Sequence, residues 1–372
     1  GDLVLDLPGS NLGSAAFNVE NGGLVMVDAD AIGPAALSLD GGSLKLSSPG
    51  GDITYASSFD VTANSSLTAG QHGSGVVGPL TAYLDGDISF TSTSTLNISA
   101  TDSYTLRLRG DITGNGTNNL TAGNIIIEDT VFNAVTLNGA NLTVYTNLTV
   151  SSLVQNSGNF TTAGSSKDLT VTDTLTLAGT LDFSGGPNLV LTGADVTLNN
   201  PANITYDKAL AADSLTIFNG AQLHLGTNSL SVGTFLWRNG GTFDSTGPIT
   251  ASTRMTFYPQ RTIANLLLGS GDVYLGDPED NDGYIELTAA NLYTGNTQIR
   301  RAKLRAEDGV GLPTASRLVF RAGGQDWRCV WQTTGTIARS IGTGAGEVSW
   351  SDQGGGFASF GGPLTIALEG NA

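Results

Sequence analysis

The chain has very few of the residues on which several classes of protein depend. Its 372 residues include one cysteine and two histidines, and charged residues make up 13%, against a usual share of about 25%. A single cysteine excludes an internal disulfide and a cysteine-based zinc site. The low content of Glu, Lys and Arg excludes a coiled coil or a helical bundle.

Basic residues are also scarce, because acids outnumber bases by 33 to 16 and give a formal net charge of −17. Nucleic acids and anionic membranes would repel such a surface, so we expect no nucleic-acid partner. No uncharged apolar run approaches the ~18 residues of a membrane-spanning helix, so we also expect no transmembrane segment. The acidity is uneven: residues 1–236 hold 20 acids and 5 bases, and residues 237–372 hold 13 and 11.

What the sequence does contain is short alternating segments between glycine-rich turns. Glycine accounts for 51 residues, and Asn-Gly, Gly-Gly and Ser-Gly pairs supply turns. In segments such as 142–144 and 175–177 apolar residues alternate with threonine, which is the period-two pattern of half-buried strands. Helical periodicity does not extend beyond a turn or two. The sequence therefore predicts an all-β protein.

A longer period of about 20 residues runs through the middle of the chain. Two columns of apolar residues each cover 101 residues in five steps, which gives the same mean spacing. The first column follows a turn-forming residue and consists of Leu142, Phe160, Leu181, Ile204, Leu223 and Phe243. The second consists of Leu148, Leu169, Leu189, Leu215, Leu230 and Ile249.

This period predicts a right-handed parallel β-helix, a solenoid with about 20 residues per coil. Twenty residues allow three short strands, and one such coil cannot bury its own inner face, so coils must stack. If the period held throughout, the chain would form about 18 coils. A β-sandwich array is the alternative, but its repeat is about 90–100 residues.

Both ends of the sequence are strand-like. Residues 3–5 and 364–368 alternate like strands, and neither end shows a helix or a polar cap. Solenoids cap their ends because an open edge pairs with other strands. We therefore expect either a fragment of a longer protein or end-to-end self-association through open β-helix edges.

The last quarter of the chain, residues 290–372, contains two groups of distinctive segments. The first group is Asn291-Leu-Tyr-Thr-Gly-Asn-Thr-Gln-Ile299, Ala302-Lys-Leu304, Gly309-Val-Gly-Leu-Pro313 and Ser316-Arg-Leu-Val-Phe320. It resembles the autotransporter-associated β-strand repeat of bacterial surface passengers and long exported proteins. The second group, Gly344-Ala-Gly-Glu-Val-Ser-Trp350 and Gly354-Gly-Gly-Phe-Ala-Ser-Phe-Gly361, resembles a variant found in large exported proteins.

The resemblance implies a secreted passenger-type β-helix, extracellular or on the cell surface, with no catalytic residues to carry over. Together with the charge distribution it divides the chain into an acidic β-helix, residues 1–285, and a continuing β-helix, residues 286–372. We expect these parts to form one continuous rod.

One loop offers a candidate metal site. The segment 276–283 concentrates carboxylates, and hard cations such as Ca²⁺ prefer clustered carboxylate and carbonyl oxygens. Asp277, Asp280 and Asp282 are therefore candidate Ca²⁺ ligands, and a solvated acidic loop is the alternative. No other cofactor is expected.

Three further features have a structural and a functional interpretation. Arg109-Gly-Asp111 is an integrin-type tripeptide, but Gly-Asp-Ile also recurs at residues 51, 86 and 110, which favours a repeated turn into a strand. The basic cluster 300–305 could bind an anionic polysaccharide, or be neutralised by Glu307 and Asp308. Eight Asn-x-Ser/Thr sequons would be glycosylation sites in a eukaryotic secreted protein. The repeat itself requires a turn Asn, an inward Leu and an outward Thr, which favours the structural interpretation. The sequon asparagines are Asn64, Asn97, Asn115, Asn119, Asn141, Asn147, Asn159 and Asn203.

Neither histidine has a recognisable catalytic partner in the sequence, and Cys329 is expected to be buried. We therefore expect a non-catalytic extracellular structural protein, a rod that acts as an adhesin, surface scaffold or fibre subunit. The alternative is a polysaccharide-degrading or polysaccharide-binding β-helix, for which the tryptophans after residue 236 would supply exposed rings.

Overall fold

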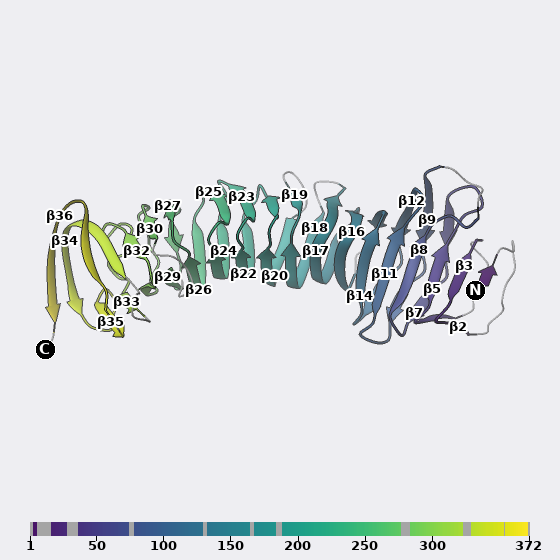
Figure 1. Cartoon of the computed structure of the whole chain (residues 1–372), viewed down its shortest axis with the longest axis horizontal. Coiled ribbons are helices and arrows are strands. Elements are labelled where there is room, and N and C mark those ends of the chain that lie inside the picture. Colours follow the sequence, from purple (N-terminus) through teal and green to yellow (C-terminus); the bar gives the residue numbers. More distant parts are fainter. Residues whose placement is uncertain are drawn as a thin grey trace. The chain divides into compact units, whose positions relative to one another are not determined.

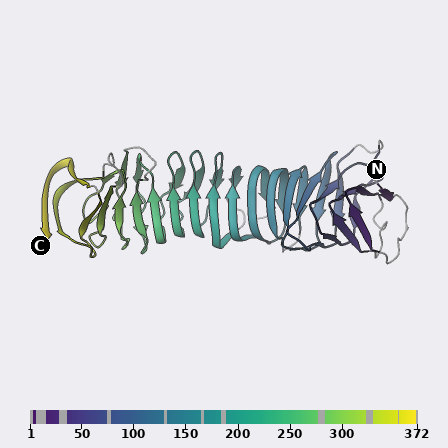
Figure 2. The same ribbon diagram turned by 60° about the horizontal axis from the view of Figure 1, so that its bottom comes forward.

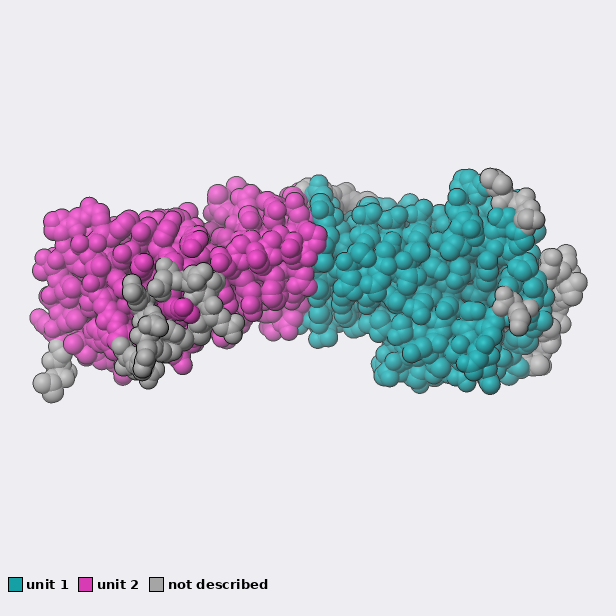
Figure 3. Space-filling view, in the orientation of Figure 1, with its two compact units in different colours: residues 1–194 teal, residues 195–372 magenta. Residues whose placement is uncertain are grey.

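The computed structural model describes residues 3–5, 16–27, 36–73, 78–128, 132–163, 167–183, 188–276, 283–322, 329–352 and 354–370. Within these residues the chain is all-β, a parallel β-solenoid of about 13 turns with about 21 residues per turn. The predicted β-helix and its coil length are confirmed. The chain divides into two compact units, residues 1–194 and 195–372, which Figure 3 colours separately. The predicted boundary at residue 285 stays a prediction.

Unit 1 stacks its strands in three parallel ladders, one on each side of the coil (Figure 1). The first contains β1 (Leu3–Leu5), β3 (Gly23–Met26), β5 (Ser43–Leu46), β8 (Ser65–Ala69), β11 (Thr95–Ala100) and β14 (Thr117–Ala122). The second contains β6 (Ile53–Tyr55), β9 (Leu80–Leu84), β12 (Tyr104–Leu108) and β15 (Asn124–Ile127). The third contains β2 (Phe17–Glu20), β4 (Leu37–Asp40), β7 (Phe59–Val61), β10 (Ile88–Phe90) and β13 (Ile112–Gly114).

The first two ladders of unit 1 merge where the strands become longer. The strand β16 (Ala134–Val144) pairs with both β14 and β15, and it is followed by β17 (Leu148–Thr162) and β18 (Asp168–Leu177). The strand β19 (Thr180–Asp182) also belongs to unit 1, and β20 (Asn188–Leu198) spans the division between the units.

Unit 2 begins with long strands, continues with short ones and ends with two long strands (Figure 2). Its long strands are β22 (Leu210–Ile217), β24 (Leu230–Trp237) and β26 (Ile249–Phe257), beside a ladder of β21 (Asn203–Thr205), β23 (Gln222–Gly226) and β25 (Thr242–Ser245). The first half of β26 pairs with β28 (Leu267–Leu268), and its second half begins a ladder of β29 (Asp272–Leu275), β31 (Thr297–Ile299), β33 (Leu318–Ala322) and β35 (Val348–Asp352). The other contains β27 (Arg261–Ile263), β30 (Tyr284–Leu287), β32 (Lys303–Arg305), β34 (Val330–Ile341) and β36 (Gly356–Gly370).

The core consists of apolar side chains that stack from coil to coil. In unit 1, Leu106 pairs with Ile125, Ile125 with Leu142, and Leu142 with Phe160, and all four side chains are buried. Burying such a side chain stabilises the fold by about 1.5–3 kcal/mol relative to exposure. Because each side chain is covered by the next coil, the coils are stable only as a stack.

The two predicted columns are correct in part. Leu148 pairs with Leu169 and Leu230 with Ile249, as the second column requires. The partner of Leu230 in the preceding coil, however, is Leu210, and Leu215 pairs instead with Phe235. Both leucines are buried in one strand, so the sequence pattern alone did not distinguish them.

Coil length varies more than the sequence columns indicate. The step from Thr117 to its partner Ala134 takes 17 residues, whereas the step from Ser65 to Leu96 takes 31. The extra residues lie in the corners between strands, where they leave the strand pairing unchanged. Within the described residues the solenoid has about 13 turns, against the 18 expected if the period held throughout the chain.

Two of the Gly-Asp-Ile segments stack directly on each other. Ile88 at the start of β10 pairs with Ile112 at the start of β13. A β-carbon at Gly110 would lie 2.3 Å from the carbonyl oxygen of Gly86, so this close approach of two backbones requires glycine. A β-carbon at Gly51, in the remaining segment, would have no atom within 4 Å.

This contrast gives a matched pair of variants. We expect Gly110→Ala to lower the free energy of unfolding by about 1–3 kcal/mol, because the new methyl group forces two backbones apart. Gly51→Ala is expected to change it by less than about 1 kcal/mol. Urea denaturation followed by circular dichroism measures both, and equal effects would contradict the assigned contact.

Candidate functional site

The segment that carries the family resemblance forms a buried corner in unit 2. The Asn291 side chain accepts a hydrogen bond from the backbone N–H of Leu267 and donates one to the carbonyl of Gly311, both at 2.9 Å. It therefore links the preceding coil to the following one. Asn291 is buried, so these bonds are protected from water.

Tyr293, two residues further on, lies at the centre of a buried hydroxyl chain. Its phenolic oxygen is 2.7 Å from Thr297 Oγ1, which is 2.8 Å from Ser316 Oγ. The Ser316 hydroxyl donates to the carbonyl of Gly295 at 2.7 Å. Burial raises the pKa of Tyr293 far above its usual range, and the opposing effects of Thr297, Ser316 and Arg339 are smaller. The motif residues thus hold the corner together.

The loop 306–313 follows this corner and is fixed from its inner side. Arg339 is buried and donates to Asp308 Oδ1 from Nη2 at 2.6 Å and from Nε at 3.0 Å. It also donates to the carbonyls of Pro313 at 3.0 Å and Ser316 at 2.7 Å. The indole N–H of Trp331 donates to the carbonyl of Ala306 at 2.9 Å. The loop is therefore held in one conformation.

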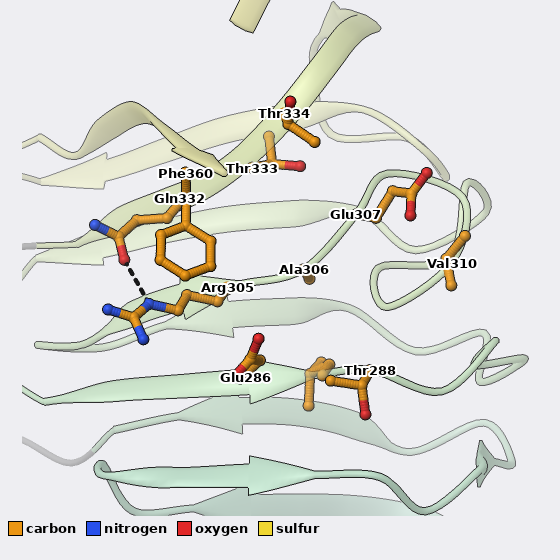
Figure 4. Close-up of a pocket in the computed structure, with 11 residues that line it drawn as sticks. Glu286, Thr288, Arg305, Ala306, Glu307, Val310, Gln332, Thr333, Thr334 and Phe360 are labelled. Carbon is orange, nitrogen blue, oxygen red and sulfur yellow. Dashed lines mark hydrogen bonds between the residues drawn. The ribbon is translucent and has the colours of Figure 1, made fainter. Parts of the chain in front are cut away.

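The outer side of this loop forms one wall of a pocket of about 260 Å³ (Figure 4). Its base is a row of outward-facing residues on neighbouring strands: Glu286 on β30 pairs with Arg305 on β32, which pairs with Gln332 on β34. The complete lining is Glu286, Leu287, Thr288, Arg305, Ala306, Glu307, Val310, Gln332, Thr333, Thr334 and Phe360. The pocket therefore combines carboxylates, hydroxyls, an amide, a guanidinium and an aromatic ring.

Arg305 is fixed between two aromatic rings at this pocket. Its guanidinium carbon lies 4.0 Å from the centre of the Tyr284 ring and 4.3 Å from that of Phe360. Its Nε donates to Gln332 Oε1 at 3.0 Å. Stacking and hydrogen bonding restrict its rotamers, so Arg305 positions both the Phe360 ring and the Gln332 amide.

Thr333 contributes a polar atom to the pocket that the protein does not satisfy. Its side chain is 3% exposed, and its hydroxyl has no hydrogen-bond partner within the described structure. A buried hydroxyl without a partner costs about 1–3 kcal/mol. A ligand atom in the pocket would supply that missing partner.

Rows of asparagines connect successive coils on the outside of unit 1. The Nδ2 group of Asn119 donates to Asn97 Oδ1 at 2.7 Å, Asn138 donates to Asn119 at 2.7 Å, and Asn156 donates to Asn138 at 2.9 Å. A second row links Asn124, Asn141 and Asn159, at 3.1 and 2.8 Å. Four of the sequon asparagines, Asn97, Asn119, Asn141 and Asn159, are therefore members of these ladders.

Arg109 of the integrin-type tripeptide is engaged within unit 1. It donates from Nε to Glu128 at 2.8 Å and from Nη1 to Asp85 at 3.3 Å, and its guanidinium lies 3.9 Å from the centre of the Tyr83 ring. Desolvation lowers the pKa of Arg109, but the hydrogen bond and charge of Glu128 and the charge of Asp85 together raise it above its ordinary value. The backbone N–H of Asp111 donates to Asp87 at 2.9 Å. These contacts favour the interpretation of the tripeptide as part of a repeated turn into a strand, rather than as an adhesion motif.

The candidate Ca²⁺ ligands Asp277, Asp280 and Asp282 lie outside the described residues, so this site stays a prediction. In the described part of the chain, no group of three or more His, Cys, Asp or Glu side chains is placed to hold a metal ion. Within the same residues no helix is long and apolar enough to cross a membrane.

The basic cluster 300–305 lies against aromatic rings. Asp308 does not neutralise it, because that carboxylate is paired with Arg339. Arg300 lies 4.1 Å from the centre of the Tyr274 ring, and Arg305 is stacked at the pocket. Aromatic rings of neighbouring coils therefore contact both guanidinium groups.

The tryptophans proposed as exposed rings belong mainly to the interior. Trp237 and Trp331 are buried, and both indole N–H groups donate to backbone carbonyls. Trp350 is partly exposed and stacks on Phe320, with ring centres 5.4 Å apart. Trp327 lies outside the described residues. The exposed ring beside a pocket is Phe360 instead.

One contact was missed although the repeat contained it. His224 Nδ1 lies 3.2 Å from Asp244 Oδ2, and the two residues are register partners on β23 and β25. The predicted column places Leu223 against Phe243, so the next residue of each strand follows directly. Cys329 is buried, as expected, and its thiol donates to the carbonyl of Ile299 at 3.1 Å.

Comparison of the chain with protein-family models, with curated proteins and with solved structures gives no match.

The buried hydroxyl chain predicts a pH dependence. Because the pKa of Tyr293 is raised in the folded state, its stabilisation is complete below the unfolded value of about 10 and is lost as the pH rises above it. Tyr293→Phe is expected to be less stable at pH 7 and to lose less stability between about pH 9 and 11.5. Urea denaturation across this range measures the slope.

The exposed Tyr145 provides the control, since Tyr145→Phe should keep the alkaline decline of the unmodified chain. Parallel pH profiles for Tyr293→Phe and the unmodified chain would contradict the assignment.

The row of asparagines from Asn97 to Asn156 predicts that removing a central member lowers the stability of the fold. Asn119→Ala removes one donor and one acceptor and should lower the free energy of unfolding by about 1–3 kcal/mol. Asn115→Ala changes a sequon asparagine that belongs to neither row and should have little effect. Chemical denaturation compares the two variants, and an unaffected Asn119→Ala protein would show that the ladder contributes nothing.

Proposed function

We propose that the chain is a non-catalytic structural protein of the cell exterior, a β-solenoid that acts as a surface scaffold, adhesin or fibre subunit. The observation that supports this proposal most is the use of outward-facing polar side chains between coils. In unit 1 the asparagines of the row from Asn97 to Asn156 bond to one another, and Arg109 bonds to Glu128 and Asp85. In unit 2, His224 contacts Asp244 in the same way. Side chains that are bonded in this way stabilise the contacts between successive coils.

The bacterial passenger origin is part of the same proposal. The resemblance of residues 291–299 to the autotransporter-associated repeat is supported by their role, because Asn291 ties three successive coils together and Tyr293 bonds to Thr297 within its own coil. A corner of this kind suits a chain that is secreted from one end and folds coil by coil.

Self-association is the fibre-forming version of the proposal. Among the described residues β36 pairs with β34 alone, and its Ile366 is 43% exposed although the partner Ile337 is fully buried. At β1, Leu3 is exposed while its partner Leu24 is buried. A further coil or a strand of a second copy would cover both positions.

Polysaccharide binding is the second candidate function, and the pocket at Phe360 favours it. That pocket combines an exposed ring, carboxylates and hydroxyls on a rigid base, which is the combination that sugar recognition uses.

Cell labelling tests the main proposal. An antibody raised against the chain should label intact cells of the source organism as strongly as permeabilised cells, because the protein lies outside. A reducing-end assay with the purified chain on pectin, alginate and neutral glucans should show no turnover. Labelling that requires permeabilisation would contradict the location, and turnover that is lost in Glu307→Gln would contradict the non-catalytic role.

A further inference from the structure

We propose that the pocket of unit 2 binds a neutral, hydroxyl-rich sugar unit of a glycan, with Glu307, Thr333 and Phe360 as its main contacts. This inference rests on the second candidate function, glycan binding, and is independent of the scaffold role. It differs from the sequence-based expectation, in which tryptophans or the basic cluster would bind the polysaccharide.

The first step is that the pocket exists before any ligand arrives. Its base is the strand row of Glu286, Arg305 and Gln332, which is fixed by backbone pairing. Its loop wall is anchored through Asn291 and Arg339, as described above. A rigid site loses little conformational entropy when it binds, which favours even a small ligand.

The second step is the unsatisfied hydroxyl of Thr333. This residue is on β34, across the pocket from the loop that carries Glu307 and Val310 (Figure 4). Its side chain is nearly fully buried, yet its oxygen has no partner in the described structure. A sugar hydroxyl can both donate and accept, so it would satisfy the Thr333 group in either orientation.

The third step is charge. The pocket lining contains two carboxylates, Glu286 and Glu307, and a single guanidinium, that of Arg305. Two aromatic rings already lie against this guanidinium, and its Nε already donates to Gln332. An acidic sugar would therefore meet more negative charge than it could pair with, whereas neutral sugar hydroxyls can donate to the carboxylates.

The fourth step is the aromatic ring. Phe360 is 42% exposed at the pocket, and one of its faces lies against Arg305. The face of an aromatic ring is electron-rich and attracts the polarised C–H groups of a sugar ring. Val310 adds apolar surface to the same pocket. A volume of about 260 Å³ is at the small end of ligand pockets and suits a sugar unit rather than a long segment.

The test uses the whole chain and defined oligosaccharides. Isothermal titration with hexasaccharides of cellulose, laminarin, amylose and xylan should give binding to at least one of these neutral probes. Oligogalacturonate and oligoalginate should bind at least about tenfold more weakly. Phe360→Ala and Glu307→Gln should each weaken binding of the neutral probe about tenfold or more.

Two matched controls separate the pocket from the general surface. Leu292→Ala removes another exposed apolar side chain of unit 2, and Glu369→Gln removes another exposed carboxylate; both residues lie outside the pocket lining. Both variants should bind like the unmodified chain. Equal losses in controls and pocket variants would overturn the proposal, as would tighter binding of the acidic probes or no binding of any neutral probe at millimolar concentration.

Thr333→Val provides a measurement that does not depend on the ligand. Valine has the shape of threonine without the hydroxyl, so the Tm should stay the same or rise while sugar binding falls. A lower Tm would show that the hydroxyl is satisfied inside the protein, and it would remove the second step. The cell-labelling experiment is unaffected by any of these results, so the two proposals can fail separately.

Discussion

The structure depends on one constraint: a coil of about twenty residues cannot bury its own apolar face. An inward side chain such as Leu142 is covered by its counterparts in the adjacent coils, Ile125 and Phe160. Parallel pairing places these counterparts about 4.8 Å apart, a spacing set by the backbone hydrogen bonds. The hydrophobic effect and the strand register therefore act along the same direction and reinforce each other.

The same spacing decides what the outer surface can contain. Side chains of one column must tolerate close neighbours of similar kind, and amides do so because each has both a donor and an acceptor. Arginines are accommodated by lying across rings of an adjacent coil, as Arg305 does on Tyr284. Aspartates at the turns accept backbone N–H groups, as Asp87 does from Asp111, instead of facing each other unpaired.

The fold could be predicted from the sequence because a period repeated over many coils is visible without any alignment. The register was correct where coil length is nearly constant, as for Leu148 and Leu169, and wrong at Leu215, where two buried leucines share one strand. The pocket could not be predicted. Glu286, Arg305 and Gln332 are separated by steps of 19 and 27 residues, so no fixed period brings them together. The His224–Asp244 contact, by contrast, was contained in the predicted column, although it was missed.

The asparagine rows also give unit 1 a direction. In both rows every amide N–H group points toward the coil with lower residue numbers, from Asn156 back to Asn97 and from Asn159 back to Asn124. The side-chain dipoles therefore add from head to tail, as the peptide dipoles of an α-helix do. Each row ends in a donor on one side and an acceptor on the other. The asparagine rows of two copies can join end to end only when both copies point in the same direction, because a donor end must meet an acceptor end. The outer surface of unit 1 therefore has a defined direction along the stack.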